Sequence, residues 1–277
     1  MAAAAAVDVD AEAFRRLGFA FPVPALTGPE TAALRAWLDA FEARDHGEGR
    51  AASRTRLLRF KPHLLHPALD CVARTPRILD AVASLLGPDL MVWASAFFIK
   101  DAGDPAFVSW HQDSGTYGLD GDDLVTAWIA LDAVDAANGA MRFAPGSHRE
   151  GARAWRATDD PANMLSLGET IDGVDEAAAV DVELQAGSMS LHQIHLLHSS
   201  PANRSARPRI GYAVRYMAPT MRPRSGPASA LLVRGVDACG HFEPETPPDP
   251  GDPAATRARW TRAMTLREAR VAASAEA

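Results

Sequence analysis

Two segments in the first third of the chain place apolar residues at helical spacing. Thr27, Pro29 and Glu30 supply an N-cap, an early proline and a capping-box glutamate. The apolar stripe that follows them consists of Leu34, Trp37, Leu38 and Phe41. A second stripe, which Gly87 terminates, consists of Ile78, Leu79, Val82, Leu85 and Leu86. Both segments are therefore predicted to be amphipathic helices that pack on a sheet.

The middle of the chain has the pattern of strands. Residues 90–100 and 124–132 are apolar and aromatic, and residues 180–185 alternate between apolar and polar. Turn signals at residues 144–147 and 186–187 lie between such segments. Short strands with few intervening helices favour an antiparallel sandwich or barrel over an alternating βαβ sheet. The sequence thus predicts a mainly β (α+β) fold with flanking N-terminal helices.

Two segments interrupt or follow this strand region. Residues 150–179 are polar and irregular, and two interpretations stay open: a lid over a site, or a solvated insertion without a role. Residues 243–253 are too rich in proline for a regular element, and the alanine- and arginine-rich stretch after them predicts a terminal helix. We expect one catalytic domain over residues 1–242. Residues 243–277 form a proline-rich linker and a helical tail that is expected to be dispensable for chemistry.

Composition and charge narrow the class of protein. The 277 residues are 47% hydrophobic and 23% charged, as in ordinary globular proteins. The net charge of -7 disfavours nucleic acid or a membrane surface as a partner and fits a small-molecule substrate. Cys71 and Cys239 form no CxxC pair, which indicates a reducing compartment. Residues 1–6 lack the features of a signal peptide, so a cytoplasmic location is expected. The oligomeric state is unknown at this stage.

The candidate chemistry begins at His111 and Asp113. Side chains alternate along a strand, so these two residues project to one side while Gln112 points away. Two imidazoles and one carboxylate on one face of a metal, with the other positions open, is the arrangement of non-haem Fe(II) oxygenases. The open positions are where O2 and a co-substrate would bind. A third ligand must come from elsewhere in the chain.

Three histidines after residue 187 compete to be that third ligand. If residues 188–199 form one uninterrupted strand, His192 and His198 face one side and His195 the other. His192 and His198 would then lie roughly 20 Å apart, so one metal takes only one of them. The chain turns after His198 and returns as a strand from about residue 207, which places His198 beside Arg209 in a hairpin. This favours His198.

Several blocks in order resemble one known family. They are residues 110–113 (WHQD), residues 138–148 (NGAMRFAPGSH) and residues 198–205 (HSSPANRS) followed by Arg209. Over roughly residues 14–242 the chain is similar to the phytanoyl-CoA dioxygenase family. The resemblance implies a double-stranded β-helix, which is a jelly roll or cupin-like barrel, that binds Fe(II) and uses 2-oxoglutarate and O2.

Residue by residue, the resemblance implies specific roles. The metal ligands fall on His111, Asp113 and His198, and the 2-oxoglutarate anchor falls on Arg209. The residues implied to lie beside the co-substrate are Ser200, Trp128 and Lys100. Family enzymes release succinate and CO2 while they hydroxylate a C–H bond. Related halogenases have a small residue in place of the carboxylate, so Asp113 favours hydroxylation.

Other interpretations are weighed against these roles. Arg207 shares the strand parity of Arg209, whereas Arg215 lies roughly 20 Å farther along the strand and is expected to miss the same carboxylate. Trp93 and Phe98 are expected to be core residues. The competing function is that of a cupin-like metal-dependent lyase, isomerase or binding protein without oxygenase activity, which would not need Arg209.

Overall fold

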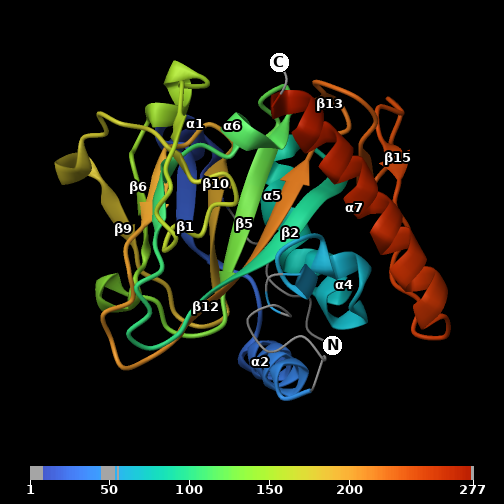
Figure 1. The fold of residues 1–277 in the computed structure, drawn as a ribbon, viewed down its shortest axis with the longest axis horizontal. Coiled ribbons are helices and arrows are strands. Elements are labelled where there is room, and N and C mark those ends of the chain that lie inside the picture. Colours follow the sequence, from blue (N-terminus) through green and yellow to red (C-terminus); the bar gives the residue numbers. More distant parts are fainter. Residues whose placement is uncertain (1–8, 45–53, 55, 276–277) are drawn as a thin grey trace.

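Two mainly antiparallel sheets packed against each other form the body of the protein (Figure 1). The computed structural model describes residues 9–44, 54 and 56–275. The larger sheet has the order β1 (Phe19–Pro24), β10 (Ser188–Gln193), β5 (Leu124–Ala130), β12 (Arg209–Met217), β2 (Leu90–Lys100), β14 (Ser229–Arg234) and β15 (Glu243–Pro244). Among the described strands of both sheets, only the pair β14 and β15 at one edge is parallel. The smaller sheet has the order β3 (Val108–His111), β11 (His198–Ser200), β6 (Met141–Phe143) and β9 (Val180–Val182). This is the predicted double-stranded β-helix.

Short strand pairs and helices complete the chain. The two additional strand pairs are β4 (Leu119–Asp120) with β13 (Arg222–Pro223) and β7 (Arg156–Ala157) with β8 (Glu169–Thr170). The α-helices are α1 (Ala11–Leu17), α2 (Gly28–Glu42), α4 (Pro67–Ala73), α5 (Pro76–Leu86), α6 (Ser114–Tyr117) and α7 (Pro253–Ala275). The 3-10 turns are η1 (Pro62–Leu64), η2 (Ala136–Asn138), η3 (Ser147–Glu150) and η4 (Glu176–Ala178).

The two predicted amphipathic helices are present and cover one face of the larger sheet. In α2 the Thr27 hydroxyl accepts a hydrogen bond from the Glu30 amide, and the Glu30 carboxylate accepts one from the Thr27 amide. The helix α5 ends at Leu86, before Gly87 with its positive φ of 93°. The apolar faces of α2, α4 and α5 form one core with the outward-facing residues of β2, β5 and β12.

Alternation along β12 separates this core from the interior of the barrel. Tyr212 and Val214 belong to the core under the helices. Arg209, Ala213 and Arg215 have the opposite parity and line a cavity between the two sheets. One face of β12 therefore packs in the hydrophobic core, and the opposite face lines the cavity.

The segment 188–199 differs from the expected single strand. The strand β10 ends at Gln193, a turn follows, and β11 begins at His198 in the other sheet. The Leu196 amide donates to the Gln193 carbonyl at 2.9 Å within this turn. The parity argument therefore does not apply, and the expected separation of roughly 20 Å was wrong. The ring centroids of His192 and His198 lie 4.6 Å apart.

The C-terminal tail is packed into the molecule. The helix α7 lies along one side of the body (Figure 1), where Trp260 is buried and donates its indole N–H to the Phe60 carbonyl at 2.9 Å. Ala263, Leu266 and Arg267 of this helix line the central cavity. The insertion 150–179 also reaches the cavity, through residues 165–167 and 169. Both segments therefore contribute to the wall of the cavity, and the lid interpretation of residues 150–179 stays a prediction.

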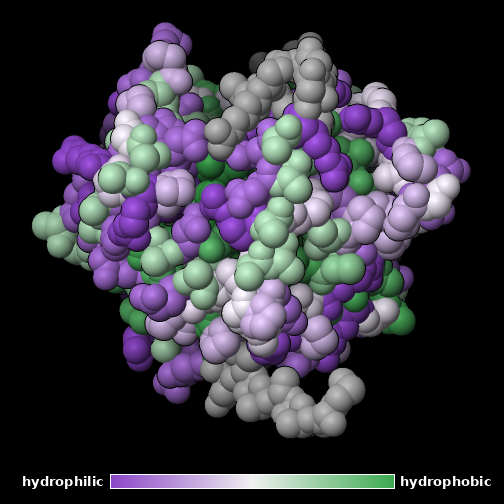
Figure 2. Space-filling model, turned by 90° about the horizontal axis from the view of Figure 1, so that it is seen from below, coloured by the Kyte–Doolittle hydropathy of each residue, from purple (hydrophilic) through white to green (hydrophobic). Residues whose placement is uncertain are grey.

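Across residues 9–44, 54 and 56–275, the helices are too short or too polar to cross a bilayer. Figure 2 shows hydrophilic and hydrophobic residues intermixed on the face seen from below. Residues 1–6, on which the signal-peptide prediction depends, lie outside the described residues.

Candidate metal centre and active site

Three buried side chains between the sheets could hold a metal ion. His111, Asp113 and His198 each offer one ligand atom, and these atoms all lie within 4.8 Å of one another. His111 ends β3 and pairs directly with His198, which begins β11. Asp113 follows two residues later, at the start of α6. Sheet pairing therefore brings together ligands that are 87 residues apart in the sequence.

Backbone carbonyls orient both imidazoles toward the metal position. The Nδ1 atom of His111 lies 2.9 Å from the Ser109 carbonyl and 3.0 Å from the His198 carbonyl. The Nδ1 atom of His198 lies 2.9 Å from the Leu196 carbonyl. A carbonyl only accepts, so each Nδ1 carries the proton and each Nε2 keeps its lone pair for a metal.

The electrostatics of these ligands suit metal binding. Burial, and then the charge of a neighbouring imidazole, lower the pKa of His111 and of His198 to about 4. Burial alone would raise the pKa of Asp113, but the adjacent His192 and His198 and the guanidinium of Arg215 hold it well below its usual value. At neutral pH the set is two neutral imidazoles and one carboxylate, which are the protonation states that bind a divalent ion.

Asp113 is further held by a neighbour in the larger sheet. Thr126 of β5 donates its hydroxyl to Asp113 Oδ2 at 2.8 Å. Because Oδ2 already accepts this hydrogen bond, Oδ1 is the carboxylate oxygen available to bind a metal. Oδ1 lies 3.9 Å from His111 Nε2. Thr126 is 2% exposed, so water does not compete for its hydrogen bond.

Arg209 lines the same cavity as the three candidate metal ligands and has an N–H group available to bind an anion. Its side chain is 1% exposed and lines the cavity at the start of β12. Nη2 donates to the Ser200 hydroxyl at 2.6 Å, whereas Nε has no hydrogen-bond partner among the described residues. A buried guanidinium with an unsatisfied N–H is costly unless a ligand completes it. The carboxylate of 2-oxoglutarate fits this requirement, because arginine binds carboxylates through paired donors.

Trp128 lies against this guanidinium, and Gly211 makes room for it. The Arg209 Cζ atom is 5.2 Å from the centroid of the Trp128 ring. A Cβ atom added at Gly211 would lie 1.8 Å from Trp128 Cζ2. Only glycine lets the indole lie flat on the backbone of β12. The structure therefore places Trp128 and Ser200 beside Arg209, where the resemblance implies them to be.

Lys100 is close to the anchor but outside the cavity lining. It pairs with Arg209 across β2 and β12 and donates to the Ser200 hydroxyl and to the carbonyls of Ser200 and Pro201. Burial, and then the positive charge of Arg209, lower the pKa of Lys100 to about 6. Lys100 therefore holds Ser200 beside Arg209, and its contact with the co-substrate stays a prediction.

Three further polar residues near the metal position, His195, Gln112 and His192, are not among the three candidate ligands. His195 contacts Ser114 Oγ and Asp122 Oδ1, each at 2.9 Å, on the far side of the turn. Gln112 donates to the carbonyls of Gly151 and His195 and points away from the metal, as strand parity predicts. His192 is 2% exposed and lies with its Nε2 3.7 Å from Asp113 Oδ2. It is a neighbour of the ligands, outside the set of three.

A cavity of about 420 Å³ surrounds these groups, within the range of about 300–1,000 Å³ typical of small-molecule sites. Its charged lining residues are Arg59, Lys61, Asp113, Glu169, Arg209, Arg215, Arg267 and Arg270. Trp93 and Phe98, expected in the core, also line it. The sequence does contain a signal for the place of Arg215, because Arg215 and Arg209 lie an even number of residues apart on one strand and therefore face the same side. Arg59 and the arginines of α7 carry no motif, because only tertiary packing brings them to the cavity.

Comparison with protein families and known sequences gives consistent matches. Residues 3–211 match the model of the family described as phytanoyl-CoA dioxygenase (PhyH). A probable alpha-ketoglutarate-dependent hypophosphite dioxygenase of Stutzerimonas stutzeri is 33% identical over 57% of this chain and 58% of its own length. Ectoine dioxygenase of Halomonas elongata is 29% identical over 72% of this chain and 66% of its own. The chain thus spans about three fifths to two thirds of these curated relatives.

Solved structures agree with the sequence comparison. A non-heme monooxygenase, ThoJ, is 39% identical with a TM-score of 0.85, over 96% of this chain and 98% of its own. CytC3, solved with Fe(II) and alpha-ketoglutarate, is 21% identical with a TM-score of 0.63, over 86% of this chain and 93% of its own. The second likeness concerns the fold alone.

Proposed function

The chain belongs to the phytanoyl-CoA dioxygenase family of non-haem iron, 2-oxoglutarate-dependent enzymes, and we propose that it hydroxylates an unactivated C–H bond of a small organic molecule. Succinate and CO2 are the by-products. The observation that carries the proposal is the meeting of His111, Asp113 and His198 within 4.8 Å, beside a buried arginine that lacks a partner for its Nε. A metal lyase would need the first feature but not the second.

Each residue of the site has a defined task in this reaction. Fe(II) held by His111, Asp113 and His198 would activate O2, which is the oxidant, while 2-oxoglutarate would supply two electrons as it becomes succinate and CO2 and the substrate C–H bond the other two. His111 and His198 present neutral Nε2 atoms because their Nδ1 protons are donated to carbonyls. Arg209 binds the distal carboxylate of 2-oxoglutarate, and Trp128 holds the guanidinium in place. The presence of Asp113 as a ligand favours hydroxylation over halogenation.

The substrate is a small molecule in this proposal. The names of the relatives refer to hypophosphite and ectoine, which are small molecules. A cavity of about 420 Å³ that also admits 2-oxoglutarate has room for a molecule of this class. The net charge of -7 argues against nucleic acid as a partner, and the free thiols of Cys71 and Cys239 support a cytoplasmic location.

Anaerobic titration tests the proposal. Fe(II) and 2-oxoglutarate added to the wild-type protein should give a weak visible charge-transfer band, and His198→Ala should abolish it. Arg209→Ala should weaken 2-oxoglutarate binding by about 10- to 100-fold, since charged hydrogen bonds contribute about 1.5–3 kcal/mol. Arg207→Ala is the matched control, because Arg207 has the same parity but pairs with Asp135 at the surface. A folded wild-type protein without the band would refute the proposal.

A further inference from the structure

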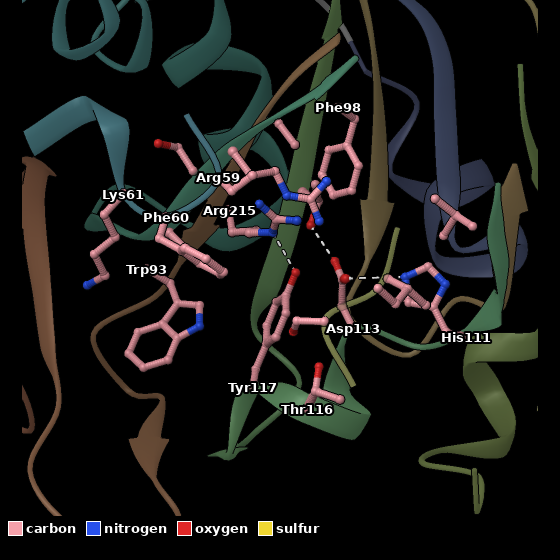
Figure 3. A pocket seen from close by; sticks show the side chains of 18 of the residues that line it. Arg59, Phe60, Lys61, Trp93, Phe98, His111, Asp113, Thr116, Tyr117 and Arg215 are labelled. Carbon is pink, nitrogen blue, oxygen red and sulfur yellow. Dashed lines mark hydrogen bonds and ion pairs between the residues drawn. The ribbon is translucent and has the colours of Figure 1, made fainter. Parts of the chain in front are cut away.

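Two guanidinium groups, those of Arg59 and Arg215, lie side by side in the cavity that Arg209 also lines. Arg59 precedes η1, and Arg215 lies in β12. Their Cζ atoms lie 4.6 Å and 5.6 Å from the centroid of the same ring, that of Phe98. Figure 3 shows the two groups next to each other between Phe98 and Tyr117, with Asp113 and His111 beyond them.

These two guanidinium groups lack a carboxylate partner within ion-pair distance among the described residues. Arg59 donates Nη2 to the Met164 carbonyl at 2.7 Å, and Arg215 donates Nε to the Tyr117 hydroxyl at 2.5 Å. Both acceptors are uncharged. The pKa of Arg59 is lowered to about 10, first by burial and then by the charge of Arg215. Asp113 also faces Arg215, but the metal would take up its negative charge.

The arginines of α7 extend the same positive region toward the outer part of the cavity. Arg267 lies with its Cζ 3.9 Å from the Phe60 ring centroid, and Arg270 lies 4.5 Å from that of Trp93. Burial, and then the charge of Arg267, lower the pKa of Arg270 to about 10. Six cationic and two anionic side chains line the whole cavity. Four of the six cations are these arginines, and none of them is needed to hold the metal or 2-oxoglutarate.

The positions of Arg209 and Arg215 along β12 separate these two arginines within the cavity. Arg209 and Arg215 are six residues apart, on the same face, and Ala213 lies between them in the cavity wall. Their backbones are therefore separated by roughly 20 Å. A single 2-oxoglutarate does not reach both. Arg215 is near the metal ligand Asp113, where the substrate must present its C–H bond.

We propose that Arg59 and Arg215 form an oxyanion subsite that binds a carboxylate or phosphate group of the substrate, with the apolar part of the substrate against Phe98 and Tyr117. This inference rests on the proposed function and names the substrate class: a small organic acid or phosphate with an apolar or aromatic skeleton. Guanidinium groups donate paired hydrogen bonds to two oxygens of a carboxylate or a phosphate, and the aromatic rings keep the two arginines in place in the absence of ligand. Arg267 and Arg270 add to the positive charge of the cavity lining.

A matched set of probes tests the subsite in the anaerobic complex with Fe(II) and 2-oxoglutarate. The probes are 3-phenylpropanoate, its neutral primary amide and 2-phenylethyl phosphate, with dissociation constants measured by calorimetry. We expect the wild-type complex to bind one or both anions at least tenfold more tightly than the amide. The comparison of the two anions distinguishes a carboxylate site from a phosphate site.

Variants assign the preference to the two arginines. Arg59→Gln and Arg215→Gln should each reduce anion affinity about tenfold or more and leave the amide unchanged, whereas Arg59→Lys should retain most of the preference. Arg234→Gln is the control, because Arg234 pairs with Asp80 at the surface. Each variant is also checked for the charge-transfer band with 2-oxoglutarate, which reports on fold and iron site together.

The outcomes separate the subsite from the enzyme activity. The inference is overturned if the wild-type complex shows no preference for either anion, including the case in which no probe binds. It is also overturned if Arg59→Gln and Arg215→Gln both keep the preference. Loss of the charge-transfer band in the wild-type protein would instead refute the proposed function, whatever the anions do.

Discussion

Gly211 in β12 is the most sensitive test of how the co-substrate site is built. The Trp128 indole lies across the Cα of Gly211, and a Cβ there would be 1.8 Å from Cζ2 and 2.0 Å from Cε2 of the ring. The φ of Gly211 is not in the left-handed region, so alanine is compatible with the backbone. Gly211→Ala is therefore expected to act mainly by displacing the indole.

The size of the effect follows from these distances. Carbon atoms pack at about 3.5–4.0 Å, so the indole must move by about 2 Å. Trp128 is 3% exposed and surrounded by packed residues, and such overpacking costs about 1–3 kcal/mol in stability. Because the ring also lies against Arg209, we expect the dissociation constant for 2-oxoglutarate to rise about tenfold, which corresponds to about 1.4 kcal/mol.

Anaerobic 2-oxoglutarate titration followed by the charge-transfer band measures the affinity, and urea unfolding measures the stability. Gly28→Ala is the matched control, because a Cβ at Gly28 meets no atom within 4 Å. The smaller ring in the double variant Gly211→Ala/Trp128→Phe should recover part of both losses, and a double-mutant cycle gives the coupling between the two positions. Normal 2-oxoglutarate affinity in Gly211→Ala, or additive effects in the double variant, would refute this account of the site.

Four further predictions concern the metal ligands and α7. Zn(II) affinity should stay constant from pH 8 to about 5.5 and fall below that, since the pKa values of His111 and His198 are about 4, and a loss beginning near pH 6.5 would contradict this. Both pKa values are lowered by folding, so the unfolded chain binds more protons and the metal-free protein should lose stability as the pH falls from about 6.5 to 4, as measured by urea unfolding. Thr126→Val removes the donor to Asp113 and should reduce metal affinity about 10- to 100-fold in chelator competition, whereas unchanged affinity would exclude its positioning role. Trp260→Ala should destabilise the protein by about 3 kcal/mol and weaken binding of 3-phenylpropanoate without changing 2-oxoglutarate affinity; equal losses for both ligands would show a general collapse of the site.

Local patterns predicted those elements whose structure depends on neighbours in the sequence. The capping box at Thr27 and the stop at Gly87 lie where the sequence places them, and the strand 90–100 has the predicted bounds. Periodicity was less informative for residues 180–185, of which only 180–182 form a strand. The hydrogen-bonded pairing between β9 and β6 ends at Val182. The sequence of one strand does not show how far its partner strand will extend.

The third ligand shows where local reasoning fails even when its choice agrees with the structure. His198 does meet His111 and Asp113, yet the argument from one continuous strand was wrong, because the chain turns after Gln193 and changes sheet. His192 therefore lies beside the site instead of roughly 20 Å away. The position of a corner between two sheets depends on the packing of the whole barrel. Residues 194–197 contain no Gly, Pro, Asn or Asp that would indicate a turn there.

The sequence by itself determined the chemistry of the centre, because ligand type and short spacing are local properties. His111 and Asp113 lie two residues apart on a strand, and the blocks around them resemble one family. The tertiary structure alone decided the shape and charge of the substrate pocket. Arg59 lines the same cavity as Arg215 and the arginines of α7, which follow it by more than 150 residues, through contacts that no sequence spacing records. Such long-range contacts arise from burial and packing, whose partners are chosen only when the whole chain folds.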